Sequence, residues 1–292
     1  MIIRKKISNK YKKFSNSLME NFIPIPYLYT KYIPQSFCKY KDYTIVGCFD
    51  SRRRKKGLFS TWDRRNSLIH VINNEGKVIN TLVIDGKYHL GGIDIDYNSG
   101  SLYVTASNGY VNRYLIRDII NINNKYLYKK EIYMVDSDRK LISYVTKNSS
   151  VAFLNIYNGK LYLGNFNKNG NSNIKIYKLD KDGKIVLGSE KVIRNPYNYT
   201  QGMCIYRYKN TNYYIFSTSY GMFNNSILYI SRLIDNEFVT VKRVSLPPMS
   251  EQVNNINNNI GILFESGSIR YFGCLYKIRH ICEVDIKILL DK

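Results

Sequence analysis

The sequence predicts an all-β protein, a β-propeller of five four-stranded blades. Short runs of alternating β-branched and aromatic residues recur along the chain, joined in pairs by turns rich in Asn, Asp and Gly. The first strands of the repeat begin near residues 36, 92, 153, 202 and 252, a period of about 50 to 60 residues. Four antiparallel strands at that period make one propeller blade, whereas a β-sandwich would not repeat its strand order so evenly.

Each repeat opens with a predicted hairpin. Its turns favour positive φ, which Asn, Asp and Gly adopt more readily than other residues. The five strand pairs are 36–40 with 43–50, 92–96 with 101–107, 153–157 with 160–166, 202–206 with 213–219, and 252–256 with 260–265. Outer hairpins are predicted at the turns 74–76, 181–183 and 235–237.

Two segments divide the chain. Residues 31–292 are predicted to form the β-propeller domain, and residues 1–30 a basic N-terminal arm or a segment that closes the last blade. Six blades are the alternative, but they would require strands from the N-terminal segment. That segment is too polar to form a whole blade.

The chain is strongly basic, with 44 Lys and Arg against 22 Asp and Glu and a net charge of +22. Such a charge attracts polyanions and says nothing about fold. A genomic preference for Lys codons spread over a solvated surface explains the excess equally well. Nucleic acid is therefore a possible partner without a specific motif to support it.

The cysteine content and the hydropathy of the sequence indicate the cellular compartment in which the protein is expected. The five cysteines show no CxxC spacing and lie in strand-like apolar runs, so we expect buried free thiols rather than disulfides or a metal knuckle. The basic N-terminus is not followed by the apolar stretch of a signal peptide. The sequence contains no run of about 18 apolar residues, so it predicts no transmembrane helix. We expect a soluble, intracellular protein, with export by another route left open.

Polar residues recur where the repeat places one face of the propeller. The start of each inner strand and the end of each second strand meet on that face, around the channel mouth. Five polar residues occupy such positions: Gln35, His89, Gln201, Glu251 and Glu265. They are interpreted either as a ligand-binding ring or as polar groups that join neighbouring blades in a narrow channel.

The same face offers candidate metal ligands and acid–base groups. Asp50, Asn165 and Glu251 supply the oxygen ligands that Ca²⁺ or another divalent cation prefers. The pair Glu251 and Glu265 would suit acid–base work on a glycosidic bond at the right separation. His89 is a candidate base or ligand, although the three histidines have no HxH or HExxH spacing, which favours a structural role.

A basic loop follows the second strand of the first repeat. It contains Arg52, Arg53, Arg54 and the only tryptophan, Trp62. Guanidinium groups beside a stackable indole suit phosphates, sulfated or carboxylated glycans, or nucleic acid. A solvated insertion without a ligand is the alternative.

Several short sequence segments resemble those of a group of bacterial propeller proteins. They are Pro34-Gln35-Ser36, His89-x-Gly91-Gly92-Ile93, Thr200-Gln201-Gly202, Leu246-Pro247-Pro248-Met249-Ser250-Glu251 and Phe264-Glu265-Ser266-Gly267. The group is broadly similar to the quinoprotein-like and gluconolactonase-like propellers, over about residues 30–273. The lactonases bind a divalent metal through Glu, Asn and Asp, types that Glu251, Asn165 and Asp50 offer. No motif aligns these residues one by one, so the activity is not carried over.

Three functions are compatible with these observations. The leading hypothesis is a non-enzymatic propeller that captures an anionic or polyhydroxylated, glycan-like ligand at the channel mouth, with the basic loop as its rim. The alternatives are a hydrolase, either a glycosidase or a metal-dependent lactonase, at the same mouth, and a protein-interaction scaffold. A channel filled by side chains would favour the scaffold.

Overall fold

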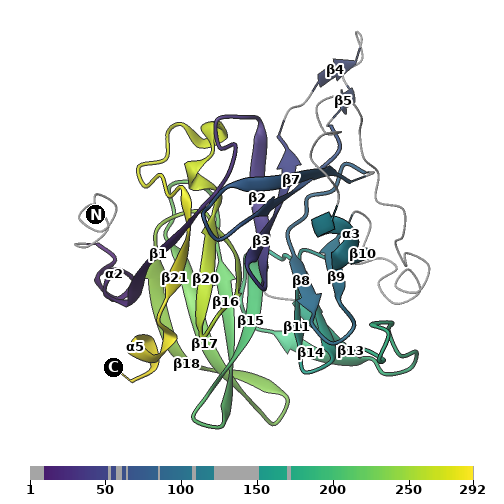
Figure 1. Ribbon diagram of the computed structural model, residues 1–292. Helices are drawn as coiled ribbons and strands as arrows, with labels where there is room; N and C mark the ends of the chain where they lie inside the picture. Colours follow the sequence, from purple (N-terminus) through teal and green to yellow (C-terminus); the bar gives the residue numbers. More distant parts are fainter. Residues whose placement is uncertain are drawn as a thin grey trace.

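Five antiparallel sheets of the described chain are arranged around one axis, which confirms the predicted five-bladed β-propeller (Figure 1). The structure is a computed structural model. It describes residues 10–51, 54–56, 61–63, 65–84, 86–106, 110–121, 151–169 and 172–291. Four of the sheets have four strands, and the second has three within the described residues.

The strands follow one another outward from the axis in each blade. Blade I comprises β2 (Tyr32–Tyr40), β3 (Tyr43–Asp50), β6 (Leu68–Ile72) and β7 (Val78–Val83), and blade II comprises β8 (Ile93–Asp96), β9 (Ser101–Thr105) and β10 (Val111–Leu115). Blade III comprises β11 (Phe153–Tyr157), β12 (Lys160–Gly164), β13 (Ser172–Lys178) and β14 (Lys191–Asn195). Blade IV comprises β15 (Thr200–Tyr208), β16 (Thr211–Thr218), β17 (Ser226–Ile234) and β18 (Glu237–Leu246). Blade V comprises β19 (Ser250–Ile256), β20 (Asn259–Phe264), β21 (His280–Val284) and β1 (Leu18–Pro24).

Blade V is completed by the N-terminal part of the chain. Its strand β1 pairs antiparallel with β21, with Phe22 opposite Cys282. The ring is therefore closed by hydrogen bonds between residues near the two ends of the described chain. The N-terminal segment thereby supplies the outermost strand of the last blade.

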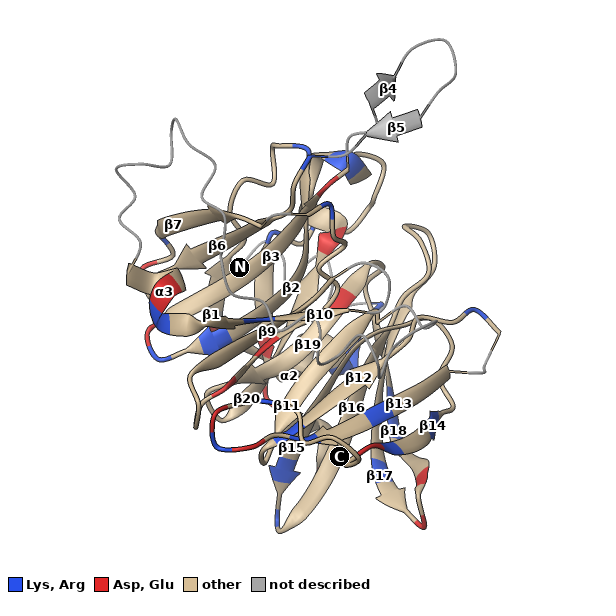
Figure 2. Cartoon of the chain, turned by 90° about the vertical axis from the view of Figure 1, so that its right-hand side faces the viewer, with Lys and Arg blue, Asp and Glu red and all other residues tan. Residues whose placement is uncertain are grey.

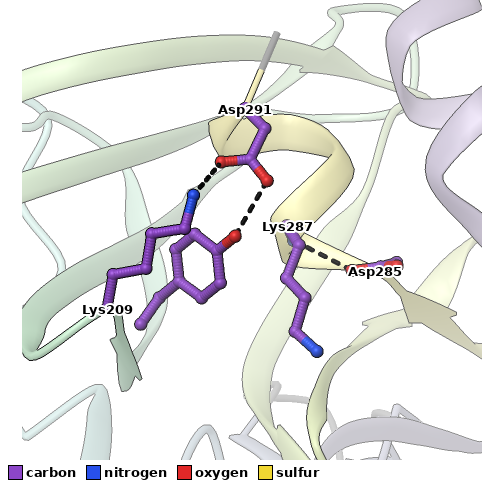
Figure 3. A network of polar contacts seen from close by, with 5 residues as sticks. Lys209, Asp285, Lys287 and Asp291 are labelled. Atoms are coloured by element: carbon purple, nitrogen blue, oxygen red, sulfur yellow. Dashed lines mark hydrogen bonds and ion pairs between the residues drawn. The ribbon is translucent and has the colours of Figure 1, made fainter.

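Short helices flank the blades. The helix α2 (Lys12–Ser17) precedes β1 and buries Phe14, and α5 (Ile286–Leu290) follows β21. Asp285 caps α5 by accepting a hydrogen bond from the Lys287 amide at 2.9 Å (Figure 3). Beyond the helix, Asp291 pairs with Lys209 of the β15–β16 turn at 3.2 Å, so the C-terminal segment is tied to blade IV (Figure 3).

Blade II has three strands within the described residues. After β10 the described chain forms α3 (Ile116–Asn121). Ile119 is fully buried, and its carbonyl accepts a hydrogen bond from Asn80 of β7 at 2.9 Å. The helix thus covers apolar surface between blades I and II.

The inner strands converge closely at the axis, and glycine permits this at two positions. A Cβ on Gly92 would lie 2.4 Å from the Leu154 amide nitrogen, and one on Gly202 would lie 2.7 Å from the Gln252 Cα. No side chain fits where backbones meet at these distances. Neighbouring blades therefore contact one another directly through their first strands.

The structure also tests what the sequence predicts about the cysteines, the basic residues and membrane-spanning helices. All five cysteines are buried free thiols, as predicted, and burial raises the pKa of Cys282 to about 12. In the view of Figure 2, Lys and Arg residues occur in several blades and loops of the described chain. None of the helices described is long and apolar enough to cross a membrane.

Candidate functional site at the channel mouth

Three polar side chains of the predicted ring lie at β-bulges. The pairing register shifts between Pro34 and Ser36 in β2, between Thr200 and Gly202 in β15, and between Ser250 and Val253 in β19. Gln35, Gln201 and Glu251 therefore lie inside the inner strands, and the expectation that they precede these strands is wrong. The extra residue of a bulge leaves the ladder and re-aims its side chain, so the bulges set where these groups point.

Glu251 and Glu265 form a hydrogen-bonded carboxyl pair. Glu251 comes from the bulge of β19 and is 3% exposed, and Glu265 begins the short 3₁₀ helix η2 (Glu265–Gly267) directly after β20. Burial raises the pKa of Glu251 well above its usual range, and the negative charge of Glu265 raises it further. Glu251 is accordingly protonated at neutral pH and donates the hydrogen bond to Glu265.

Glu265 is held by two further donors. Gln35 Nε2 of blade I donates to its Oε2 at 2.8 Å, and the hydroxyl of Tyr271, in the 3₁₀ helix η3 (Ile269–Tyr271), donates to the same oxygen at 3.0 Å. Burial raises the pKa of Glu265 to about 7, although all three hydrogen bonds act to lower it. The carboxyl pair thus holds one or two protons near neutral pH, and Glu265 joins blade V to Gln35 of blade I.

The geometry of the carboxyl pair limits its chemistry. Retaining glycosidases hold their two carboxyl groups about 5 Å apart and inverting ones still farther, to leave room for a sugar or a water. A hydrogen bond between Glu251 and Glu265 brings the two carboxyls closer than that in this arrangement, and the pair offers both a donor and an acceptor oxygen.

The middle of the channel is filled by a second polar cluster. Gln252 Oε1 accepts from the amides of Phe37 and Ile93, each at 3.1 Å, and its Nε2 donates to the Ile93 carbonyl at 2.8 Å. Asn254 Nδ2 donates to the Phe37 carbonyl at 3.1 Å and to Asp94 at 3.0 Å. Two side chains of β19 thereby cross-link the inner strands of blades I, II and V.

Asp94 is the centre of this cluster. Its carboxylate accepts from Asn254, the Ile95 amide, Asn155 at 2.8 Å and the Ile156 amide at 2.6 Å. Burial raises the pKa of Asp94 to about 6 despite these bonds. Amides that join blades across the channel are the structural alternative predicted for the ring, and here they belong to the layer below it.

A cavity of about 290 Å³ opens at the other end of the channel. Asp94, Asp96, Tyr97 and Asn254 are among the residues that line it. Asp96 accepts hydrogen bonds from the Ser99 hydroxyl at 2.6 Å and from two backbone amides of its own turn. Both carboxylates of this cavity are therefore committed to the fold.

Aromatic side chains gather beside the mouth between blades III and IV. Tyr199 and Tyr220 are stacked with ring centroids 4.5 Å apart, and Phe166 lies 6.0 Å from Tyr199. Tyr220 is 48% exposed, and the Lys168 ammonium lies 5.6 Å from its ring centre. Sequence reasoning missed this cluster, although its rings flank the repeat: Tyr199 immediately precedes β15, and Tyr220 follows the end of β16.

The other predicted mouth residues lie between blades I and II or beside the aromatic cluster. His89 is exposed and its ring lies 4.7 Å from that of Phe49, at the end of β3. Gln201 is half-buried, and its amide donates to the Ser219 carbonyl at 3.4 Å. These contacts place His89 against blade I and Gln201 against the end of the second strand of its own blade.

The predicted cation ligands come from three different blades. Asp50 ends β3 of blade I, is buried, and accepts from the Arg65 amide at 3.0 Å; Asn165 follows β12 of blade III; Glu251 belongs to blade V. Within the described part of the chain, no group of three or more His, Cys, Asp and Glu is suited to hold a metal ion. The set of ligands remains a prediction.

The predicted basic rim falls largely outside the described residues. Arg52 and Arg53 are not among them. Arg54 lies in β4 (Arg54–Lys56) and Trp62 in β5 (Thr61–Asp63), two short strands that pair antiparallel. Their side chains are likewise outside the description, so the rim also stays a prediction.

No family model and no curated protein matches the chain in sequence. Among solved structures, the fold is similar to the glutaminyl cyclase of Myxococcus xanthus, with a TM-score of 0.51 and 9% identity over 91% of this chain and 94% of that one. A tail fibre of Staphylococcus aureus phage P68 gives 0.50 and 14% over 90% of this chain and 53% of that one. An α-L-arabinofuranosidase of Clostridium thermocellum gives 0.48 and 13% over 82% and 83%. At these identities the likeness concerns the fold alone.

Proposed function

We propose that the protein is a ligand-binding propeller whose channel mouth captures a polyhydroxylated, glycan-like ligand. The observation that carries the proposal is the carboxyl pair of Glu251 and Glu265, fixed at the mouth together with Gln35. A pair that holds a proton offers donor and acceptor oxygens at once. Sugar hydroxyls are themselves both donors and acceptors, so they match such a group.

The charge of the pair helps choose between the two ligand classes expected from the sequence. A buried carboxyl pair that is partly ionised repels an anion placed against it. We infer that hydroxyl groups occupy the inner mouth. Acidic groups of the ligand, where it has them, would face outward to cations such as Lys168 beside Tyr220. Arg52, Arg53 and Arg54 would extend that rim.

The stacked pair Tyr199 and Tyr220 supplies the second half of the proposed site. A partly exposed ring held by a second ring is a rigid apolar platform, suited to the apolar face of a sugar. The platform and the carboxyl pair lie on the same side of the propeller, because each is attached where an inner strand begins or a second strand ends.

A glycan array followed by titration calorimetry tests this proposal. Tyr220→Ala should weaken the binding of any glycan found about fivefold, since an aromatic contact contributes about 1 kcal/mol. Tyr97→Ala is the matched control, because Tyr97 is 61% exposed but lies in the β8–β9 turn at the opposite end of the channel. A glycan that binds both variants as it binds the unaltered protein would contradict the proposed site.

A hydrolase at the same mouth is the second candidate, and the titration of Glu265 favours it. A pKa of about 7 suits a general acid or base at neutral pH. Metal-dependent lactonase chemistry would additionally require Asp50, Asn165 and Glu251 to hold a divalent cation. Incubation of a bound glycan or lactone with and without Ca²⁺ separates the candidates. Product formation that Glu265→Gln abolishes while binding persists would establish the hydrolase.

The filled channel favours the third candidate, a protein-interaction scaffold. Gln252 and Asn254 occupy the space that a channel ligand would need, which confines any small ligand to the mouth. Under this alternative the carboxyl pair and the tyrosine platform would have no ligand. Failure of all glycans to bind, together with capture of a protein partner that Tyr220→Ala does not weaken, would support it.

A further inference from the structure

The loops that surround the carboxyl pair expose an unusual amount of apolar surface. Phe272 and Leu275, in the β20–β21 connection, are 80% and 77% exposed, and Phe223, in the β16–β17 connection, is 81% exposed. Ile269 and Tyr220 add half-exposed side chains in the same two loops. Isolated surface apolar residues need no explanation, but a contiguous group on one face marks an interaction surface.

The two loops form one surface. An added Cβ on Gly273 would meet the sulfur of Met222 at 3.7 Å, and the Cys274 thiol lies 3.9 Å from the Met222 carbonyl. Both loops join a second strand to a third strand, so both lie on the mouth side of the propeller, at the top of Figure 1. The Ile269 amide also donates to the Leu28 carbonyl at 2.8 Å, which brings the β1–β2 loop to the same surface.

Cations surround these apolar side chains. Arg270, Lys277 and Arg279 are exposed in the β20–β21 loop, and the Lys277 ammonium lies 4.5 Å from the ring centre of Phe272. Across the fully described loops 25–31, 219–225 and 265–279, Glu265 is the only acidic residue. It is hydrogen-bonded into the mouth. The exposed part of this surface is therefore apolar and positively charged.

We propose that these loops, 219–225 and 265–279, dock the protein onto an anionic lipid surface, with Phe223, Phe272 and Leu275 entering the interface. The proposal goes beyond glycan binding and does not require it. Exposed aromatic and aliphatic tips flanked by Lys and Arg are the combination that holds peripheral proteins at a bilayer interface. Each cation near an anionic leaflet strengthens binding about fivefold at moderate ionic strength. A lipid surface matches both features, because it accepts projecting side chains and complements the positive charge.

The docked orientation would turn the channel mouth toward the lipid. Tyr271 shows how one segment serves both tasks: its hydroxyl holds Glu265, while its neighbours Ile269 and Phe272 point to solvent at 48% and 80% exposure. The proposed docking loop and the proposed ligand site therefore share a wall. A ligand carried at a membrane surface would meet the mouth directly.

Co-sedimentation of the full-length protein with lipid vesicles tests the docking surface. We expect binding to phosphatidylcholine vesicles that contain phosphatidylserine, weakened by salt, and little binding to pure phosphatidylcholine. Replacing Phe223, Phe272 and Leu275 together by Ser should weaken binding at least tenfold. Arg270→Gln with Lys277→Gln should weaken it about tenfold or more at low salt.

Two controls keep the test decisive. Leu187→Ser removes a side chain that is 70% exposed in the β13–β14 connection, on the opposite side of the propeller, and should leave binding unchanged. Phe272→Trp in a Trp62→Phe background should show a blue-shifted fluorescence on vesicles, which brominated lipids quench if the ring enters the bilayer. The proposal is overturned by absent vesicle binding, by equal binding of the triple Ser variant, or by an unshifted, unquenched signal from the introduced indole.

A failure here would be distinguishable from failure of the glycan site. The vesicles carry no glycan, and Tyr220→Ala is not expected to abolish docking. The unaltered protein could fail to bind vesicles and instead self-associate in sedimentation velocity. If the triple Ser variant does not self-associate, the surface binds a second copy of the chain and the lipid proposal is wrong.

Discussion

Replacing Glu265 by Gln should flatten the dependence of stability on pH. The folded pKa of Glu265, about 7, is above the ordinary glutamate value of 4.5, so the folded state holds more protons than the unfolded state between these values. Stability from this group is fully present below about pH 4.5 and is lost as pH rises through about 7. Between pH 5 and pH 8 the loss from Glu265 amounts to about 2 to 3 kcal/mol in the free energy of unfolding.

Other groups titrate in the same range, so the variants must be compared at each pH. Asp94, with a pKa raised to about 6, has the same sign as Glu265, whereas burial lowers the pKa of His70 to about 4 and gives the opposite sign. Both are unchanged by the substitution and cancel in the difference. Urea unfolding at pH 5, 6.5 and 8 measures that difference directly.

Glu251→Gln provides the informative comparison. Glu251 also has a pKa raised well above its usual range, so its stabilising contribution is likewise lost as pH rises, and Glu251→Gln should flatten the pH dependence too. Glu283→Gln serves as a control, because Glu283 is 4% exposed and accepts a hydrogen bond from Asn259 at 2.7 Å away from the carboxyl pair. If the stability of Glu265→Gln changes with pH as steeply as that of the unaltered protein, the assignment of the titrating group is incorrect.

Three further substitutions probe the scaffold by thermal and urea unfolding. Gly202→Ala places a Cβ 2.7 Å from the Gln252 backbone and should destabilise the fold by several kcal/mol, about 3 or more; a loss below about 1 kcal/mol would show that the inner strands separate easily. Gln252→Ala leaves the buried amides of Phe37 and Ile93 without their acceptor and should cost about 3 kcal/mol, whereas an unchanged midpoint would mean water replaces the side chain. Asp285→Ala removes the cap of α5 and should cost about 1 kcal/mol, and no loss would show that this helix contributes little.

The hairpins were predictable because local chemistry specifies them. Asn158 and Asn257 adopt the positive φ that their turns require, at 48° and 52°. The adjoining strands are rich in apolar residues, as expected for strands, and most of their residues are buried. Repetition then indicated the architecture, because a hairpin that recurs five times at one period has few arrangements other than a propeller.

The features that define the site were not predictable in the same way. A bulge inserts one residue without a sequence signature, so Gln35 and Glu251 were expected before their strands rather than within them. The hydrogen bond from Gln35 to Glu265 joins residues 230 positions apart, and its existence depends on closure of the ring. Local patterns identified the polar residues of the mouth, but only the closed fold determines which of them meet.

The difference between the two ends of the channel explains why the mouth is the better candidate for a ligand. Asp94 accepts four hydrogen bonds from donors within the protein, so a ligand at the 290 Å³ cavity would have to displace bonds that hold three blades together. Displacing such bonds leaves buried groups unpaired, which costs about 1 to 3 kcal/mol each. At the mouth, by contrast, Glu251 and Glu265 satisfy one another through a proton that can be redirected to a ligand oxygen. Under the proposed function, a ligand would bind there by exchanging one hydrogen bond for another while the cross-links of the inner strands stay intact.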